Sequence, residues 1–461
     1  MLRSMLHAAG AALLLTVPAI VTGQDRLTTA TAQAQPALSL ADLEQRALKN
    51  NPTVGQADAE IEAARGRAKQ AGLLPNPTIG YTSSEVSRGP VINGGEHGLF
   101  VEQTIPLGGK LGLSRHIFER EVTQAEALRT AQRQRLLTDV RVQFYTVLAA
   151  ERRVEIRREL ARIGDEAVGV SRQLYNTGAA DRSDVLASEI EARQMQVAFE
   201  AAQNDRFRVW RQLAALVNDA SLTPRPLDGS IDATPPDLQR DAVLQQILTA
   251  SPELLASRAA LERERAALTR ARREKAPDLI VRGGPRYNRE LLEANGRPVG
   301  WEAAVDVGLT IPLFNRNQGG IAESRALVGR AEQEVTRLEL SLQSRAADVF
   351  SEYLTNLRTA EAYRREIVPR AEESYRLYLA RYREMAAAYP QVLVAQRTLN
   401  QVSDEYVHSA EMAWMAALQL QGLLLGGGLD SSPRVGEGLG AGGSSAGSGR
   451  GMNGMSGTNR R

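Results

Sequence analysis

The chain has 461 residues, with 56 Lys and Arg against 54 Asp and Glu and a formal net charge of +2. Only 5% of the residues are aromatic, 39 are glycine and none is cysteine. This composition argues against a compact enzyme with a large aromatic core. The balanced charge gives no reason to expect a nucleic-acid partner, and the missing thiols exclude disulfides, thiolate metal sites and a lipidated N-terminal cysteine.

The N-terminus has the order of a secretory signal peptide. A basic start at Met1–Arg3 precedes an apolar stretch from Ala8 to Val21 and a polar segment ending in Ala32–Ala34. The apolar stretch is shorter than the roughly twenty residues of a membrane-spanning helix, which disfavours an uncleaved anchor. We predict cleavage after Ala34, with Gly23 as the other candidate. No later window is apolar over eighteen residues, so the mature chain is expected to enter a membrane only as strands.

The rest of the chain is an internal duplication with a period of about 200 residues. Four landmarks recur in the same order: Asn51-Pro52 and Ser251-Pro252, Leu74-Pro75 and Ala276-Pro277, Thr104–Leu107 and Thr310–Leu313, and Tyr175–Leu186 and Tyr382–Leu393. The predicted segments are a signal peptide at 1–34, a first repeat at 35–235, a second repeat at 236–425 and a disordered Gly/Ser-rich tail at 426–461.

Each repeat has the composition of a helix, a β-hairpin and a long helical hairpin. The helices are expected at Leu40–Leu73 and Val243–Lys275, the β-hairpins at 77–107 and 278–313, and the helical hairpins at 109–218 and 319–425. The clearest strand is Trp301–Ile311, where apolar residues alternate with Glu302, Asp306 and Thr310. One face of this hairpin should therefore be apolar and the other carboxylate-bearing.

Four strands of about ten residues are long enough to cross a bilayer when tilted. Four strands cannot close on themselves, however, and open sheet edges are not tolerated in lipid. A membrane location therefore requires more than one chain. The alternative is a pair of soluble hairpins that cover a helical bundle.

The long helical tracts would reach unusually far. No proline interrupts Gly109–Asn176, which carries an apolar stripe at Leu136, Val140, Phe144 and Leu148 and would extend about 100 Å as one helix. The second copy contains Val368-Pro369, where we expect a kink or a break.

Four stretches resemble the TolC outer-membrane efflux family, most closely its heavy-metal branch of CzcC-like and CusC-like proteins. They are Gln70–Pro77, Ile105–Lys110, Tyr175–Gly178 running to Asp184–Leu186, and Ile311–Gly319. The resemblance implies an α+β membrane protein of TolC-like fold, in which three chains pool four strands each into a 12-stranded barrel continued by a long periplasmic α-helical barrel. It also implies a homotrimer in outer-membrane lipid that works as a passive duct without cofactor or enzymatic activity, with a periplasmic adaptor and an inner-membrane RND pump as partners.

The resemblance further places the adaptor contact and the gate at two turns, Asn176–Asp184 and Arg383–Gln391. The candidate residues there are Tyr175, Gly178, Asp181, Asp184, Arg383 and Gln391. The second turn has Met385–Ala388 where the family has glycine, which leaves its geometry open. Asp184 could form a carboxylate ring around a threefold axis or stabilise the helix start, whereas Asp181 fits a helix cap better.

Pro106, Gly108, Gly109 and Pro312 are expected to form the corners between strands and long helices.

The sequence pattern is compatible with other functions. The same fold could export drugs or small molecules or serve as a type I secretion duct, and a periplasmic coiled-coil scaffold or a periplasmic enzyme with a helical domain would be different classes. Histidines 97, 116 and 408 are too scattered to suggest a metal site, and none is predicted.

Overall fold

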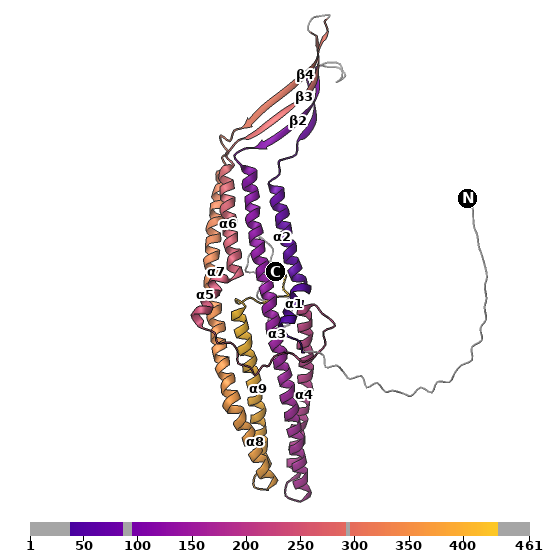
Figure 1. Ribbon diagram of the computed structural model, residues 1–461, viewed down its shortest axis with the longest axis vertical. Coiled ribbons are helices and arrows are strands. Elements are labelled where there is room, and N and C mark those ends of the chain that lie inside the picture. The colour runs from indigo at the N-terminus through magenta and orange to yellow at the C-terminus, as the bar shows by residue number, and fades with distance from the viewer. Residues whose placement is uncertain (1–36, 86–94, 292–295, 432–461) are drawn as a thin grey trace, which may run out of the picture. The chain divides into compact units, whose positions relative to one another are not determined.

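The computed structural model of the protein describes residues 37–85, 95–291 and 296–431 (Figure 1). The predicted signal peptide, residues 432–461 of the predicted tail and part of each strand-joining loop lie outside the described residues. Within the described ranges, no helix combines the length and the hydropathy needed to cross a membrane.

Each repeat begins with two helices where the sequence suggested one. In the first repeat, α1 (Leu40–Asn50) ends before α2 (Pro52–Ala71), because Asn51 has an extended backbone with φ −71° and ψ 127°. A residue before proline avoids the helical region, whereas the proline itself suits the first helical position. The second repeat breaks in the same way at Ser251, between α5 (Arg240–Ala250) and α6 (Pro252–Arg273).

The two β-hairpins form one antiparallel sheet in the order β1-β2-β3-β4. The strands are β1 (Thr78–Ser84), β2 (Glu96–Pro106), β3 (Asp278–Leu291) and β4 (Pro298–Thr310). The central pair, β2 and β3, joins the two repeats, with Ile105 opposite Leu279. The free edges are consequently β1, from the first repeat, and β4, from the second.

The sheet has two faces of opposite character. One face exposes apolar side chains, including Trp301 with 74% and Val305 with 72% of its surface accessible. The other carries charged residues: Arg286 donates to Glu302 over 3.1 Å and to Glu96 over 2.7 Å. The alternation predicted for β4 is therefore seen in the neighbouring strands as well, with exceptions such as Gln103 on the apolar face.

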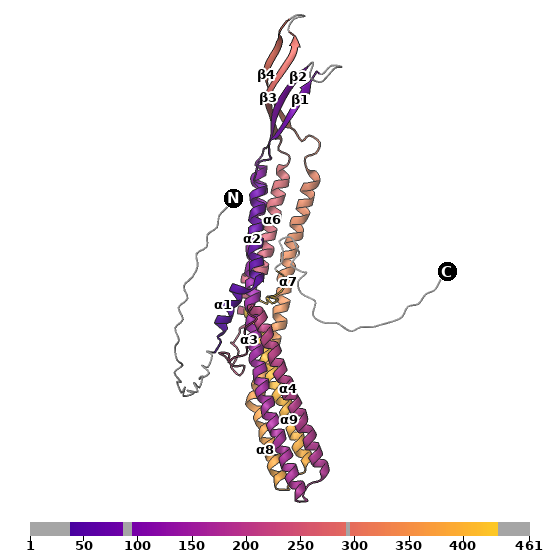
Figure 2. The same cartoon turned by 90° about the vertical axis from the view of Figure 1, so that its right-hand side faces the viewer.

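The long helices begin below the sheet and return as hairpins (Figures 1 and 2). Helix α3 (Lys110–Asn176) is continuous over 67 residues and is followed by α4 (Arg182–Val217). In the second repeat, α7 (Gln318–Ala362), a π-helical turn η1 (Tyr363–Ile367) and α8 (Val368–Arg383) descend, and α9 (Tyr389–Gln421) returns. The predicted stripe on α3 is fully buried, with Leu136 and Val140 at 0% exposure.

The π-helical turn lies next to the proline that led us to expect a kink. Pro369 has no amide hydrogen to donate to the preceding turn, so regular α-helical hydrogen bonding cannot continue through it. The chain stays helical here by widening to a π-turn at Tyr363–Ile367.

Three of the four predicted corner residues stand at the first strand-to-helix junction. Pro106 ends β2, and Gly108 and Gly109 follow it with φ of +72° and +71°, which only glycine adopts without strain. Pro312 follows β4 in the second junction, where Asn317 takes the left-handed conformation with φ +61°.

The first residues of the predicted tail are bound to the helices. The amides of Gly427 and Gly428 donate to Asp139 over 3.1 and 2.6 Å, and Gly428 is buried. The composition predicts disorder from residue 426 onward, and this start is wrong for Gly427 and Gly428. Composition misses them because backbone hydrogen bonds do not depend on apolar side chains.

Candidate functional site

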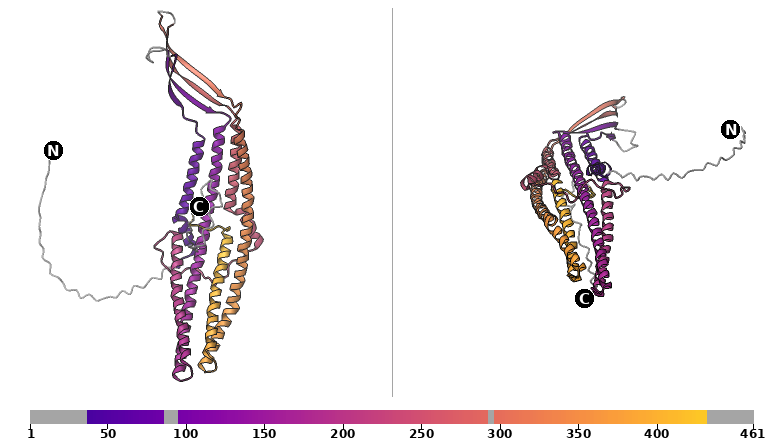
Figure 3. Two further views of the ribbon diagram at one scale, coloured as in Figure 1. Left: turned by 180° about the vertical axis from the view of Figure 1, so that it is seen from behind. Right: turned by 60° about the horizontal axis from the view of Figure 1, so that its bottom comes forward.

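The turns of the two helical hairpins lie at the same end, opposite the sheet, and contain the residues singled out by the sequence (Figure 3). In the first turn, Gly178 takes φ +75°. Its amide donates to the carbonyl of Tyr175 over 3.0 Å, and the amide of Ala179 donates to Leu174 over 2.8 Å. This pair of hydrogen bonds is the Schellman motif, which satisfies the last carbonyls of α3.

The second turn repeats this motif without a glycine. Met385 takes φ +58° and donates to the carbonyl of Tyr382 over 3.0 Å, while Ala386 donates to Arg381 over 2.8 Å. The geometry left open by the sequence is therefore the same in both turns. A side chain in the left-handed region costs roughly 1–2 kcal/mol, so the second turn is strained where the first is not.

The acidic candidates lie at the start of α4. Asp181 is at the N-cap position with an extended backbone, but its side chain makes no capping hydrogen bond. Asp184 is half-buried in the first helical turn, where a negative charge is favoured by the helix dipole. Gln391 lies exposed at the start of α9, where its amide donates to the carbonyl of Ala388 over 3.1 Å.

Side chains link the first hairpin to the second near these turns. Arg383, at the end of α8, donates to Glu166 of α3. On another face, Arg397 of α9 donates to the buried carboxylate of Glu191 on α4 over 3.0 Å. Together with a buried apolar cluster that includes Leu160, Tyr375 and Leu399, these contacts join the two hairpins.

Tyrosines fill the space between the hairpins. The hydroxyl of Tyr382 lies 3.3 Å from Ser171 Oγ, and its ring centroid is 5.6 Å from that of Tyr389. Burial raises the pKa of Tyr375 and of Tyr389, and the nearby carboxylates of Glu166 and Glu191 respectively add to this effect. These phenols therefore stay neutral at physiological pH.

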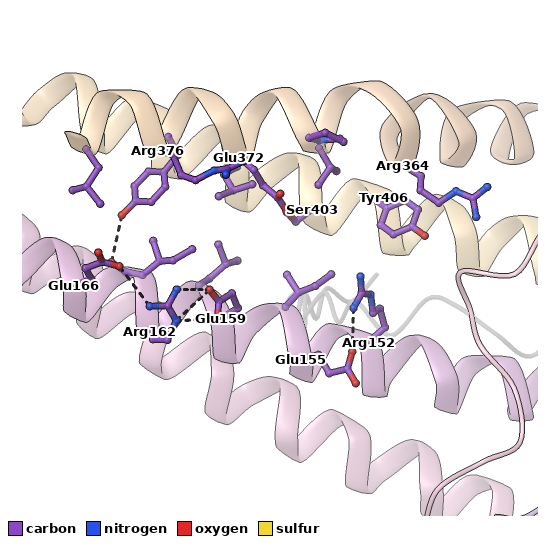
Figure 4. Close-up of a pocket in the computed structure, with 18 of the residues that line it drawn as sticks. Arg152, Glu155, Glu159, Arg162, Glu166, Arg364, Glu372, Arg376, Ser403 and Tyr406 are labelled. Carbon is purple, nitrogen blue, oxygen red and sulfur yellow. Dashed lines mark hydrogen bonds and ion pairs between the residues drawn. The ribbon is translucent and has the colours of Figure 1, made fainter. Parts of the chain in front are cut away.

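A groove of about 800 Å³ lies between α3 and α8, and Glu166 and Arg383 are among the residues that line it. Figure 4 shows ten of the lining residues with labels. It is lined by alternating charges, among them Glu155, Glu159, Arg162, Glu372 and Arg376. Both walls carry positive and negative side chains, so the groove does not favour ligands of one charge.

The described side chains offer no evident catalytic or metal-binding arrangement. Within these ranges, no three His, Cys, Asp or Glu residues are grouped closely enough to hold a metal ion.

Sequence reasoning found the turns but missed three residues that join them, Glu166, Glu191 and Arg397. Each lies in a helix whose charges alternate in sign, a pattern typical of a solvated face. The sequence gives no signal for a partner on another hairpin.

Comparisons with known proteins agree with this architecture. A sequence model of the family described as outer membrane efflux protein matches residues 43–219 and 243–426, one segment in each predicted repeat. The cobalt-zinc-cadmium resistance protein CzcC of Cupriavidus metallidurans is 26% identical over 320 residues, covering 69% of this chain and 75% of the relative. The nickel-cobalt-cadmium resistance protein NccC of Alcaligenes xylosoxydans xylosoxydans is 26% identical over 333 residues, covering 70% and 72%.

A solved structure of CusC, whose study concerns transmembrane channel formation, has a TM-score of 0.71 at 17% identity and covers 84% of this chain and 92% of CusC. The predicted fold is thereby confirmed, and the two metal-resistance relatives support the predicted branch. Because the family model matches well over half of the chain, the protein belongs to the outer membrane efflux protein family, located in the outer membrane and extending into the periplasm.

Proposed function

We propose that this protein is the exit duct of a tripartite efflux system and that it conducts heavy-metal cations passively. The main observation behind this proposal is that the chain combines two long helical hairpins with a sheet that exposes an apolar face. An apolar face such as that around Trp301 suits lipid, whereas the charged face around Arg286 suits water. No chemical step is assigned to the chain itself.

The free edges of the sheet support assembly into a homotrimer. β1 and β4 each leave one row of backbone groups without a strand partner inside the described chain. Pairing β4 of one copy with β1 of the next satisfies both edges, and repeating that step around a threefold axis closes the ring.

The outer face of α4 adds a second reason for self-association. It exposes Leu186, Ile190, Val197 and Phe207 at helical spacing, each with 47–59% of its surface accessible. A second groove, between α8 and α9, is lined by residues that include Tyr378 and Val394. We assign these two surfaces to the helical contacts between neighbouring copies.

The two turns are the proposed contact for a periplasmic adaptor and the proposed gate. Arg383 and Glu166 hold α8 to α3 at this end. An exposed ion pair contributes less than about 1 kcal/mol, so this link is readily broken when a partner pulls on the hairpin. Asp184 lies beside the same turns and would offer carboxylates to a passing cation.

Heavy metals are proposed as cargo because both curated relatives are named for resistance to cobalt and cadmium. An inner-membrane RND pump would select the ion and supply the energy. The polar sheet face carries the carboxylate of Asp306 beside those of Glu96 and Glu302, which are paired with Arg286.

Two measurements test this function. Detergent-extracted protein should behave as a trimer and form pores in a planar bilayer, and deletion of its gene should sensitise cells to cobalt, zinc or cadmium. Sensitivity to drugs with unchanged metal tolerance would replace metals with drugs as the cargo. If the protein is extracted without detergent and forms no pores, the proposed duct function is refuted.

A further inference from the structure

The segment between the two repeats crosses the second helical hairpin at its π-helical turn, and one aspartate there contacts three helical elements. Tyr406 of α9 donates to Asp232 Oδ1 over 2.6 Å, and Arg364 of η1 donates to the carbonyl of Asp232 over 2.5 Å. Arg152 Nε of α3 lies 3.5 Å from Asp232 Oδ2. One residue of a connecting loop thereby joins both hairpins.

Neighbouring residues of this loop are held as firmly. Trp414 Nε1 of α9 donates to the carbonyls of Ile231 and Ala233 over 3.3 and 3.2 Å. Tyr353 of α7 donates to the carbonyl of Pro236 over 2.7 Å. Both aromatic side chains are buried, so water does not compete for these bonds. Residues 231–236 therefore form a strap across α7, η1 and α9.

The other end of the loop is attached to the first repeat. Leu38 donates to the carbonyl of Pro226 over 3.0 Å, and Asp228 donates to the carbonyl of Leu38 over 3.1 Å. The loop thus has a fixed anchor before it reaches the strap.

The strap lies where the second hairpin is easiest to bend. The π-helical turn and Pro369 interrupt regular hydrogen bonding at the junction of α7 and α8. Directly below, a groove of about 800 Å³ lies between α3 and α8. Figure 4 shows Arg152, Arg364 and Tyr406 at one end of this groove and Glu166 at the other.

We propose that Asp232 is a positioning residue that clasps this hinge, fixing the upper end of α8 to α3 so that the lower end can move only as a lever. This inference rests on the proposed function, because it assigns the pivot for the proposed gate. With the clasp intact, the Arg383–Glu166 contact is the part that opens. Without it, the hinge itself is released and the tips separate spontaneously.

The experiment measures the distance between the tips directly. The chain contains no cysteine, so Arg182→Cys and Glu384→Cys, both at exposed positions next to the turns, give two unique sites for spin labels. Labelled chains are diluted with unlabelled ones in detergent-extracted protein, so that pulsed EPR reports the distance within a chain. Asp232→Ala and Tyr406→Phe should broaden this distance distribution and lengthen its mean.

Pore measurements on the same variants supply the functional readout. Asp232→Ala should raise the open probability of pores in planar bilayers by about fivefold or more, the effect of losing a hydrogen bond to a charged group. Asp232→Glu should restore part of the wild-type behaviour. Asp228→Ala is the matched control, because this exposed loop carboxylate accepts no hydrogen bond within the described residues.

The outcomes separate the two proposals. Unchanged distances and unchanged pores in Asp232→Ala would overturn the clasp, even if the variant melted at a lower temperature. Wild-type protein without pore activity would refute the duct, while the distance measurement would still decide the clasp. A change of equal size in Asp228→Ala would also overturn the assignment, because it would show a general effect of the loop.

Discussion

Gly178 and Met385 occupy the same position in two turns with the same hydrogen bonds, although only one of them is glycine. Their φ angles are +75° and +58°. The duplication has therefore preserved the backbone of the turn and not the residue that suits it best.

This relationship predicts opposite effects of substitution in the two turns. Met385→Gly should stabilise the helical part by about 1 kcal/mol, because the strain of a left-handed side chain is removed. Gly178→Ala should destabilise it by a similar amount, since a new Cβ there meets no atom within 4 Å and only the φ angle matters. Thermal unfolding followed by circular dichroism checks both. Equal effects of the same sign would contradict the assignment.

The second prediction concerns two adjacent tyrosines. The hydroxyl of Tyr389 is buried without a hydrogen-bond partner in the described structure, whereas that of Tyr382 lies 3.3 Å from Ser171 Oγ. Tyr389→Phe should therefore stabilise the protein by about 1 kcal/mol and Tyr382→Phe should destabilise it by about as much. Denaturant titration of both variants measures the difference. A loss of stability in Tyr389→Phe would show that this hydroxyl has an ordered partner.

The third prediction is a loss of stability at high pH. Burial raises the pKa of Tyr375, Tyr389 and Tyr406 above 10.0. The folded chain then holds these protons more tightly than the unfolded chain, so stability is fully present below pH 10 and falls as the pH rises above it. Melting temperatures from pH 7 to 11 should be flat at first and then decline. Tyr375→Phe should make the decline shallower, and an unchanged slope would count against this origin.

The fourth prediction tests the link between the hairpins. Arg383→Glu places two carboxylates together and should increase pore conductance, and Glu166→Lys should do the same through two cations. Combining the two changes restores opposite charges and should return conductance toward the wild type. Arg381→Glu, on the same helix and without an ion pair among the described residues, is the control. Failure of the double variant to recover would mean that the single changes act through folding.

The fifth prediction distinguishes the faces of the sheet. Val307 is exposed on the apolar face, and Asp306 lies on the opposite face of the same strand. Val307→Lys should impair membrane insertion, because a lipid-facing lysine near the bilayer centre costs about 2–4 kcal/mol. Asp306→Lys should insert normally. The yield of heat-resistant assembled protein in isolated outer membranes measures the difference, and equal yields would contradict a lipid-facing Val307.

The sequence predicts those parts of the fold that depend on local patterns. Alternation in β4, the uninterrupted run through α3 and the stripe around Phe144 each follow from neighbours a few residues away. The breaks before Pro52 and Pro252 were missed, because one helix was predicted across each of them, although proline chemistry accounts for both.

The remaining features depend on residues far apart in the chain. Glu166 and Arg383 lie on helices whose charges look solvated, and only the packing of two hairpins makes them partners. Asp232 lies in a loop with no periodicity, so nothing local marks it. The turn at Met385 was left open for another reason, since its conformation is imposed by the hydrogen bonds of the turn against the residue's own preference.

The order of strands in the sheet has a consequence for genetics. Because one free edge comes from the first repeat and the other from the second, every contact in the proposed ring pairs unlike surfaces. A chain damaged at only one edge can still join a neighbour through the other and so enter the ring. Such an allele should be dominant over the wild type, because each defective chain inactivates an assembly that also contains wild-type chains.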